Sequence, residues 1–367
     1  MSRPVEIGPV PVTDGALLLR AARYADFPRW REVRLRNRRV MERYWLTSPL
    51  SWDERHTEWR WVQEVTDARR TARLGTGLAF VIEVDGELVG QVGLSGIDRV
   101  AGTAELGIWA DLRVARRDVA TLAACAVVDH AFDHLGLEVV TAPVSTRNFS
   151  VALATSHIGM VAEATMRGYS HVGGVWQDHD LLSVLATDRP VDGFVVRRQA
   201  SRGEDEPRPA GTRPARSPDH LPGSRSSRVA LARYTASRVR GDLRGRAPRR
   251  ARPATVTTTV DGAAVTAGLR HLDRGRSAAE AYVDADVEAA RSAEAATAAL
   301  RQVVEHATGT LGLHRVSAVA APDDGVRAAA YAAAGLRHEG TLRSRLRPDG
   351  TRGDLDLWAR LADDPTP

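Results

Sequence analysis

The sequence predicts an α/β protein of the α+β kind, with a mixed, mostly antiparallel sheet, helices on both faces, and a second, incomplete domain of the same type. Three observations support this prediction. Strand-like and helix-like patterns along residues 15–187 follow the order β-α-α-β-β-β-α-β-α-β-β. Within that order, residues 104–137 combine a short strand, an arginine-rich loop and an amphipathic helix. The same combination recurs at residues 279–313, which indicates an internal repeat.

Length and composition are typical of a globular protein with two domains. The chain has 367 residues, of which 43% are hydrophobic and 26% charged. The apolar runs are too short for a membrane span and the first residues lack signal-peptide character, so we expect no membrane association. Cys125 is the single cysteine, which excludes a disulfide framework and a cysteine metal site and favours the reducing cytoplasm. We expect it to be a small buried side chain, and we expect no metal.

The basic residues give little evidence for a nucleic-acid partner. The net charge is +5 and the pI is near 9.9, yet every one of the 51 basic residues is arginine. Such uniform usage indicates a coding bias across the whole chain. Arginine clusters are therefore discounted as evidence for nucleic-acid binding.

The first domain is expected to begin after a loose tail at residues 1–14. A strand at residues 17–21 precedes two helices at residues 26–45 and 52–66. Five tryptophans are concentrated in this part of the chain: Trp30, Trp45, Trp52, Trp59 and Trp61. Burial in the core is favoured over a role in lining an acceptor pocket, because aromatic side chains stabilise chiefly through burial.

The remaining elements of the first domain form hairpins around a central helix. Asp85-Gly86 is a strong signal for a two-residue hairpin turn, and Gly136 is a candidate C-cap of the central helix. The expected strands are residues 79–84, 87–97, 104–110, 138–144, 160–169 and 175–184, and a short helix is expected at residues 151–157.

A linker and a second domain are expected to follow. Residues 188–253 are rich in Pro, Gly, Ser and Arg, which is typical of a partly disordered linker. Residues 254–363 repeat the first domain in altered form. In this alignment Glu280, Glu339 and Arg343 correspond to Glu105, Glu163 and Arg167 in the order of the repeat.

The joint order of several motifs resembles the GCN5-related N-acetyltransferases (GNAT). These motifs are AELGIWA, a loop, VATLAACAVVDHAF, LGL, the asparagine of STRNFS, and HIGMVAEATMR. Within that superfamily, YWLTSP, EVDGELVGQVGL and WQDH are similar to the bacterial ribosomal-protein N-terminal acetyltransferase (Rim-type) branch. The second copy resembles the same branch through LGLHRVSA and GLRHEGTLRSRLRPDG.

The resemblance implies acetyl-CoA as co-substrate and a primary amine as acceptor. The amine must lose a proton before it attacks the thioester, so a carboxylate is useful, and Glu105 is the candidate base. Its alternative role is that of a strand-edge charge facing solvent. A group must also reprotonate the CoA thiolate, and Ser150 is a weak candidate for that acid.

The same resemblance assigns the binding of CoA to the loop and the start of the central helix. Main-chain N–H groups there would hold the pyrophosphate. The candidate cofactor-binding residues are Leu112, Val114, Arg116, Arg117, Asp118, Val119, Ala120, Thr121 and Asn148. The alternative role of Asn148 is an N-cap of the helix that follows.

The loop departs from the family pattern, in which glycines let the backbone wrap around a phosphate. Arg116 and Asp118 stand at the two glycine positions. Asp118 would place a negative charge beside the pyrophosphate, which Arg116 and Arg117 would partly offset. In the second copy the corresponding loop, residues 288–294, has no glycine and two acids, so we expect that copy not to bind CoA.

Two functions therefore remain open from the sequence. One is an N-acetyltransferase acting on a protein N-terminus, such as that of a ribosomal protein, or on a small-molecule amine. The other is a catalytically inactive pair of GNAT-like domains that acts as a binding or scaffolding module. A tether to RNA through the arginine run at residues 238–252 is weighed against a merely solvated linker, which is favoured. The chain is expected to be a monomer with pseudo-dimeric domains or a homodimer.

Overall fold

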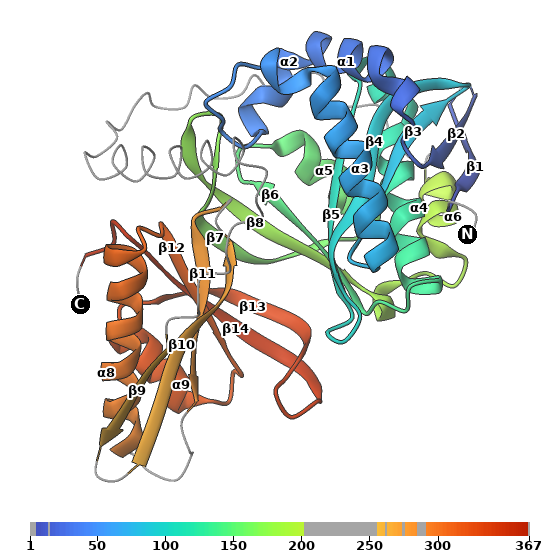
Figure 1. Cartoon of the computed structure of the whole chain (residues 1–367). Helices are drawn as coiled ribbons and strands as arrows, with labels where there is room; N and C mark the ends of the chain where they lie inside the picture. Colours follow the sequence, from blue (N-terminus) through green and yellow to red (C-terminus); the bar gives the residue numbers. More distant parts are fainter. Residues whose placement is uncertain are drawn as a thin grey trace, which may run out of the picture. The chain divides into compact units, whose positions relative to one another are not determined.

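The computed structural model describes residues 5–13, 15–201, 255–260, 263–273, 276–284 and 291–365 (Figure 1). The chain divides into two compact units. The first comprises Met1–Arg198 together with Glu339–Asp356, and the second comprises Gln199–His338 together with Leu357–Pro367. Most of the predicted linker, including the arginine run, lies outside the described residues.

The first unit contains a mixed sheet with the strand order β1-β2-β3-β4-β5-β6-β8-β7. Its strands are β1 (Ile7–Val12), β2 (Gly15–Arg20), β3 (Gly77–Val84), β4 (Glu87–Asp98), β5 (Thr103–Ala110), β6 (Val139–Ser145), β7 (Val161–Val172) and β8 (Val175–Leu185). Neighbouring strands are antiparallel except for β5 and β6, which are parallel. The predicted mixed, mostly antiparallel sheet is confirmed.

Helices cover both faces of this sheet, as predicted. They are α1 (Phe27–Arg36), α2 (Arg38–Met41), α3 (Glu58–Leu74), α4 (Val119–Asp133), α5 (Phe149–Ile158) and α6 (Gly193–Ser201). Trp30 of α1 and Trp61 of α3 share a core cluster with Val81. Leu122 of α4 belongs to the other cluster, with Ile82. Consecutive strand residues point to opposite faces of the sheet. Helices α1 and α3 therefore lie on one side of β3, and α4 lies on the other.

Burial confirms the core interpretation for three of the tryptophans and for the cysteine. Trp30, Trp52 and Trp61 are fully buried, whereas Trp59 is 66% exposed. Cys125 is buried in α4, and its burial raises the pKa of the thiol to about 12. At neutral pH this thiol therefore stays protonated and serves as a core side chain.

Turn chemistry places several predicted boundaries correctly. Asp85 and Gly86 both have positive φ, as a two-residue turn between β3 and β4 requires. Gly159 caps α5 with φ of 90°, the left-handed conformation that ends helices. The predicted C-cap of the central helix is misplaced: α4 is capped by His134, and Gly136, with φ of 64°, lies two residues further on.

Two elements lie where the sequence predicted none. Strand β1 occupies part of the expected N-terminal tail and pairs antiparallel with β2. Helix α6 lies within the predicted linker, and Phe194 at its start is 1% exposed. Both segments are short, so their apolar patterns are too brief to distinguish them from loops in the sequence.

The second predicted helix also begins later than expected. From Trp52 the chain forms a turn and a short 3₁₀ helix, Glu54–His56. Helix α3 starts at Glu58, because the Thr57 side chain accepts a hydrogen bond from Arg60 N (3.5 Å) and caps the helix there. The helix then continues to Leu74 and is closed by Gly75, with φ of 70°.

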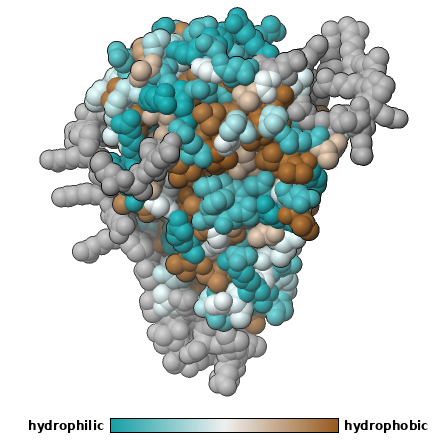
Figure 2. Space-filling model, turned by 90° about the vertical axis from the view of Figure 1, so that its right-hand side faces the viewer, coloured by the Kyte–Doolittle hydropathy of each residue, from teal (hydrophilic) through white to brown (hydrophobic). Residues whose placement is uncertain are grey.

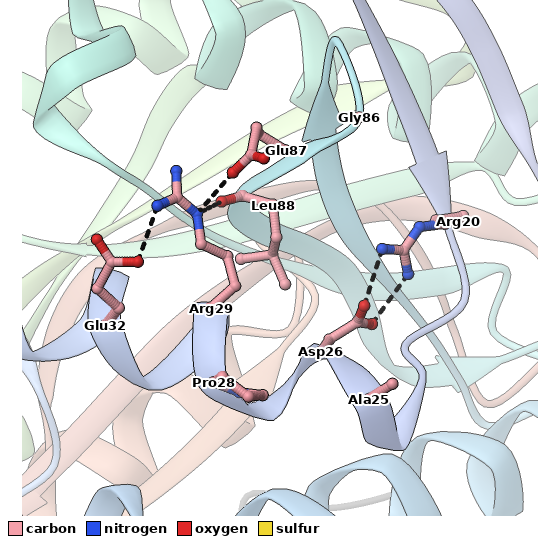
Figure 3. Close-up of a pocket in the computed structure, with 9 residues that line it drawn as sticks. All are labelled: Arg20, Ala25, Asp26, Pro28, Arg29, Glu32, Gly86, Glu87 and Leu88. Carbon is pink, nitrogen blue, oxygen red and sulfur yellow. Dashed lines mark hydrogen bonds and ion pairs between the residues drawn. The ribbon is translucent and has the colours of Figure 1, made fainter.

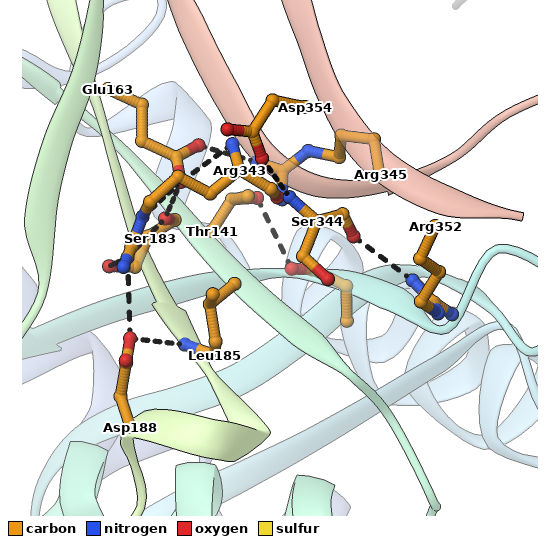
Figure 4. Close-up of polar contacts among 11 residues, drawn as sticks. Thr141, Glu163, Ser183, Leu185, Asp188, Arg343, Ser344, Arg345, Arg352 and Asp354 are labelled. Atoms are coloured by element: carbon orange, nitrogen blue, oxygen red, sulfur yellow. Dashed lines mark hydrogen bonds and ion pairs between the residues drawn. The ribbon is translucent and has the colours of Figure 1, made fainter.

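Residues 339–356 belong to the first unit through β13 (Arg337–Leu346). Gly340 pairs antiparallel with Ala164 of β7. Next to this pair, Glu163 accepts hydrogen bonds from Arg343 Nε (3.1 Å) and Arg345 Nη2 (2.8 Å) (Figure 4). The Glu163 side chain is 1% exposed, so its charge is buried and neutralised by two guanidinium groups.

The ion pairs of this segment are reciprocal. Glu163 pairs with Arg343, and Arg167 pairs with Glu339 at 3.2 Å. The main-chain N–H groups of Arg167 and Arg343 also donate to Glu339 and Glu163, at 3.1 and 3.2 Å. These four side chains thus tie β13 to β7 through two ion pairs and two main-chain hydrogen bonds.

The second unit has the same element order as β3 to α5 of the first. Its elements are β9 (Thr255–Val260), β10 (Ala263–Asp273), β11 (Ala278–Asp284), α8 (Arg291–Glu305), β12 (Arg315–Ala320), α9 (Gly325–Ala333) and part of β14 (Arg352–Leu361). Strands β9, β10 and β11 are antiparallel neighbours, and β11 is parallel to β12. Helix α8 buries Leu300 and Val303 in the core of this unit.

The surface of the described residues is mixed in character. Figure 2 shows hydrophilic residues between the hydrophobic ones on the face that it draws. Among the described helices, none is long and apolar enough to cross a membrane.

Candidate active site

Strands β5 and β6 separate in the middle of the sheet. Their parallel pairing covers three residues of each strand, Thr103–Glu105 against Val139–Thr141. Beyond Glu105, β5 remains paired with β4 up to Ala110, and β6 remains paired with β8 up to Ser145. The edge of β5 that faced β6 is therefore released from strand pairing directly after Glu105, and its main-chain groups become available to a ligand.

Glu105 lies on an accessible part of β5. Side chains alternate along the strand, so Glu105, Gly107 and Trp109 share the face that carries α1 and α3. Gly107 is exposed, and a Cβ at this position would meet no atom within 4 Å. The surface beside Glu105 is therefore open to a small acceptor group.

The start of α4 has the backbone geometry of a phosphate-binding turn. A 3₁₀ segment, Leu112–Arg117, ends at Asp118, whose φ of 58° and ψ of 20° are left-handed. The first hydrogen bond of α4 runs from Leu122 N to Asp118 O (3.0 Å). The main-chain N–H groups of Val119, Ala120 and Thr121 come before this first hydrogen bond of the helix. Together with the helix dipole, they favour an anion at this end of α4. Asp118 thus takes the conformation for which the family pattern has glycine.

The other predicted donor-site residues have different positions. Val114 and Val119 are buried in the main core, and Thr121 is also buried. Because their side chains are buried, these residues could contact a ligand only through main-chain groups. Leu112 is 55% exposed and Ala120 is half-buried. The side chains of Arg116 and Arg117 lie outside the described part of the structure.

Arg198 is a member of this region that the sequence did not indicate. Its Nε is 2.7 Å from Asp118 Oδ2, and the two side chains are only 8% and 13% exposed. Arg198 lies on α6, within the predicted linker, so the only available signal was its identity as one arginine among many.

Asp111 anchors the other end of the loop to α1. Its carboxylate accepts hydrogen bonds from Arg36 Nε (3.1 Å) and Asn37 Nδ2 (2.9 Å). Asn37 Oδ1 accepts in turn from Leu112 N (3.1 Å). Burial opposes the charged form of Asp111, but the hydrogen bonds from Arg36 and Asn37 outweigh it and lower the pKa of the carboxyl group. Helix α1 and the loop before α4 are thereby fixed to each other.

Asn148 and Ser150 lie at the start of α5, directly after β6. Asn148 Oδ1 accepts from Val151 N (3.4 Å), so the N-cap role is observed. Ser150 is exposed in the first turn of the same helix. The structure places Ser150 on a helix and Glu105 on the sheet, and no hydrogen bond joins these two described side chains. Their joint role in catalysis stays a prediction.

A cluster of tryptophans holds a buried guanidinium near the end of β5. The Arg34 guanidinium lies 4.2 Å from the ring centroid of Trp45 and 4.0 Å from that of Trp109. Arg34 Nη2 and Trp109 Nε1 both donate to Gln91 Oε1, at 3.2 and 2.9 Å. Burial lowers the pKa of Arg34 to about 9. Trp45 and Trp109, which are partly exposed, thus adjoin the face of β5 that carries Glu105.

An open cleft of about 440 Å³ lies between the start of α1 and the β3–β4 turn (Figure 3). Its charged groups are paired with one another, Arg20 with Asp26 and Arg29 with Glu32 and Glu87. The cleft contains none of the predicted site residues, so it lies apart from the candidate active site.

Comparison with known proteins agrees with this geometry. Residues 16–161 match the family model described as the acetyltransferase (GNAT) domain. The chain therefore contains a GNAT acetyltransferase domain, with the fold that the sequence predicted.

Two relatives are similar to this part of the chain. The probable N-acetyltransferase YjcK of Bacillus subtilis (strain 168) is 34% identical over 105 residues, which are 28% of this chain and 58% of YjcK. The matched part thus spans less than two thirds of that relative. The structure of Mycobacterium smegmatis RimJ in complex with CoA-disulfide is similar with a TM-score of 0.53 and 29% identity, over 55% of this chain and 98% of RimJ. RimJ supports the resemblance to the Rim-type branch.

Proposed function

We propose that the first unit is an N-acetyltransferase that transfers the acetyl group of acetyl-CoA to a primary amine. The observation that supports this most is the separation of β5 from β6 directly after Glu105, next to the left-handed start of α4. One extended thioester ligand needs both features, a free strand edge and an anion-binding helix terminus. CoA in complex with the similar RimJ supports acetyl-CoA as the co-substrate.

The donor would lie along the separated strands. Main-chain N–H groups of β5 beyond Glu105 donate to the thioester carbonyl oxygen and stabilise the negative charge that develops there. The pyrophosphate lies at the first turn of α4, where the amides of Val119, Ala120 and Thr121 are available. Asn148 lies at the end of β6, on the opposite side of the separation, in reach of the pantetheine arm.

Glu105 would act as the general base. It removes a proton from the ammonium form of the acceptor, directly or through one water, and the free amine then attacks the thioester carbon. A new N–C bond forms and the C–S bond breaks. The nitrogen loses its second proton to solvent as the amide forms, and the leaving CoA thiolate takes up one proton, through Ser150 or directly from solvent, since Ser150 is exposed.

The acceptor that we propose is the N-terminal amine of a protein, such as a ribosomal protein, as the Rim-type resemblance implies. The second unit we infer to be a degenerate copy of the GNAT domain that does not bind CoA. The single buried thiol, Cys125, fits an intracellular, cytoplasmic protein.

The test uses the full chain with acetyl-CoA and peptides that carry the N-terminal sequences of ribosomal proteins. We expect acetylated peptide in the mass spectrum and stoichiometric release of the CoA thiol. Peptides with a blocked N-terminus are the matched control, and they should give neither product. If free and blocked peptides release CoA at the same rate, the proposed transfer to an N-terminal amine is contradicted.

A further inference from the structure

The donor loop contains a charge that should repel its own ligand. Asp118 stands at the start of α4 in a left-handed conformation that glycine adopts at no steric cost. Aspartate tolerates this conformation better than most residues, but it adds a negative charge at the helix terminus where a pyrophosphate would bind. Two like charges a few ångströms apart disfavour each other strongly when both are partly buried.

The structure holds a cation against this carboxylate. Arg198 Nε lies 2.7 Å from Asp118 Oδ2, in a pair with 8% and 13% exposure of the two side chains. A surface pair of this kind would contribute little, but shielding from solvent makes the neutralisation stronger.

Helix α6, which carries Arg198, is held firmly against α4 and α5. Asp129 of α4 accepts hydrogen bonds from Phe194 N (2.9 Å) and Val195 N (3.1 Å) and so caps the first turn of α6. Arg197 Nη2 donates to Ile158 O at the end of α5 (2.7 Å). Arg189, just before α6, pairs with Asp129 at 3.2 Å. These contacts fix the position from which Arg198 reaches Asp118.

We propose that Arg198 is a positioning residue of the donor site: it neutralises Asp118 and so makes the glycine-free loop able to bind the pyrophosphate of acetyl-CoA. Arg198 acts through Asp118 and is not itself a phosphate ligand. This inference rests on the proposed function, because it assumes that the α4 terminus binds CoA. It also extends the functional domain to α6, beyond the residues that match the GNAT family model.

A double-mutant cycle tests this proposal with the full chain and isothermal titration calorimetry of CoA. Arg198→Gln should weaken CoA binding about tenfold, because it leaves the Asp118 charge beside the pyrophosphate. Asp118→Gly removes that charge and keeps the left-handed backbone. The double variant should therefore bind CoA within about twofold of Asp118→Gly alone.

Arg73→Gln is the control, since it removes the same charge from an exposed position of α3 that takes no part in holding α6. Its affinity for CoA should stay within about twofold of the wild type. Thermal unfolding of each variant separates binding from stability: a purely structural role for Arg198 predicts that Asp118→Gly fails to restore affinity in the double variant.

The outcomes distinguish the inference from the function on which it rests. If the wild-type chain binds CoA and Arg198→Gln binds it equally well, the role of Arg198 is refuted while the proposed function stands. A double variant as weak as Arg198→Gln also refutes it, because Arg198 would then contact the phosphate or only support the fold. Failure of the wild-type chain to bind CoA overturns the proposed function together with this inference.

Discussion

The two units contain the same strand junction, with different residues beside its glutamate. In the first, β5 pairs with β6 up to Glu105, and in the second, β11 pairs with β12 up to Glu280. The residue across the antiparallel neighbour is Ser95 for Glu105 but Arg270 for Glu280. The fold has kept a glutamate at both junctions, but its surroundings differ.

Glu280 is bound by two side chains of β10. Its carboxylate accepts from Arg270 Nε (3.0 Å) and contacts His271 Nδ1 (2.8 Å). Burial opposes ionisation of Glu280, but the hydrogen bonds from His271 and Arg270 prevail and hold the pKa below its ordinary value of 4.5. A carboxylate with a lowered pKa that is held by an arginine is a poor general base. The structure therefore gives Glu280 an ion-pair role, while catalysis by Glu105 is our proposal.

The largest expected effect is on catalysis at the first junction. Glu105→Gln should lower kcat for peptide acetylation about a thousandfold, because an amide cannot accept the proton of the acceptor amine. The affinity for acetyl-CoA should change by less than about twofold, since the proposed role of Glu105 is toward the acceptor amine and not toward CoA. Steady-state kinetics and calorimetry measure the two quantities. Glu280→Gln is the paired control, and an equal loss of activity in that variant would contradict the assignment.

Next in size is the loss of stability when the buried carboxylate of the β7–β13 segment is neutralised. Glu163→Gln leaves Arg343 and Arg345 without their buried counter-charge and should lower the free energy of unfolding by about 3 kcal/mol. Chemical denaturation measures this change. Glu42→Gln, which removes an exposed pair with Arg38, should leave the free energy of unfolding nearly unchanged. Similar losses for both variants would show that burial does not strengthen the Glu163 contacts.

A smaller effect concerns the pH dependence of the second junction. Because the folded pKa of Glu280 is lowered, its contribution to stability is complete above the unfolded value near 4.5 and is lost as the pH falls below it. Glu280→Gln should lower the free energy of unfolding by about 1 to 2 kcal/mol at neutral pH and by less near pH 3. Denaturation curves at several pH values measure the difference. A constant difference across that range would mean that Glu280 keeps its charge state on unfolding.

The smallest effect separates the two roles considered for Asn148. Asn148→Ala should destabilise the chain by about 1 kcal/mol, because α5 loses its N-cap. Asn148→Ser keeps a capping oxygen and should restore most of that stability. If CoA affinity falls in the alanine variant but is not restored by serine, Asn148 also contacts the donor.

The sequence was sufficient for those parts of the fold that depend on periodicity and turn chemistry. The Asp85-Gly86 hairpin and the central helix that ends before Gly136 follow from local patterns. Helix α6 was missed because a helix of nine residues between Pro- and Arg-rich segments has too few apolar positions to be recognised.

The sequence predicts a site residue only where the residue type itself indicates a chemical role. Asp118 was identified as the weak point of the loop, but its left-handed backbone and its pairing with Arg198 depend on contacts between residues eighty positions apart. The same holds for Glu280, because the strand register that places Arg270 opposite it is set by tertiary structure.

The central claim is that the first junction binds the donor and the second does not. The number of acetyl-CoA molecules bound per full chain, measured by isothermal titration calorimetry, tests it most directly. We predict one site per chain, with an affinity that Asp118 substitutions change and Glu280→Gln leaves unaltered. Two sites per chain, or one site whose affinity responds to Glu280→Gln and not to Asp118, would contradict the account.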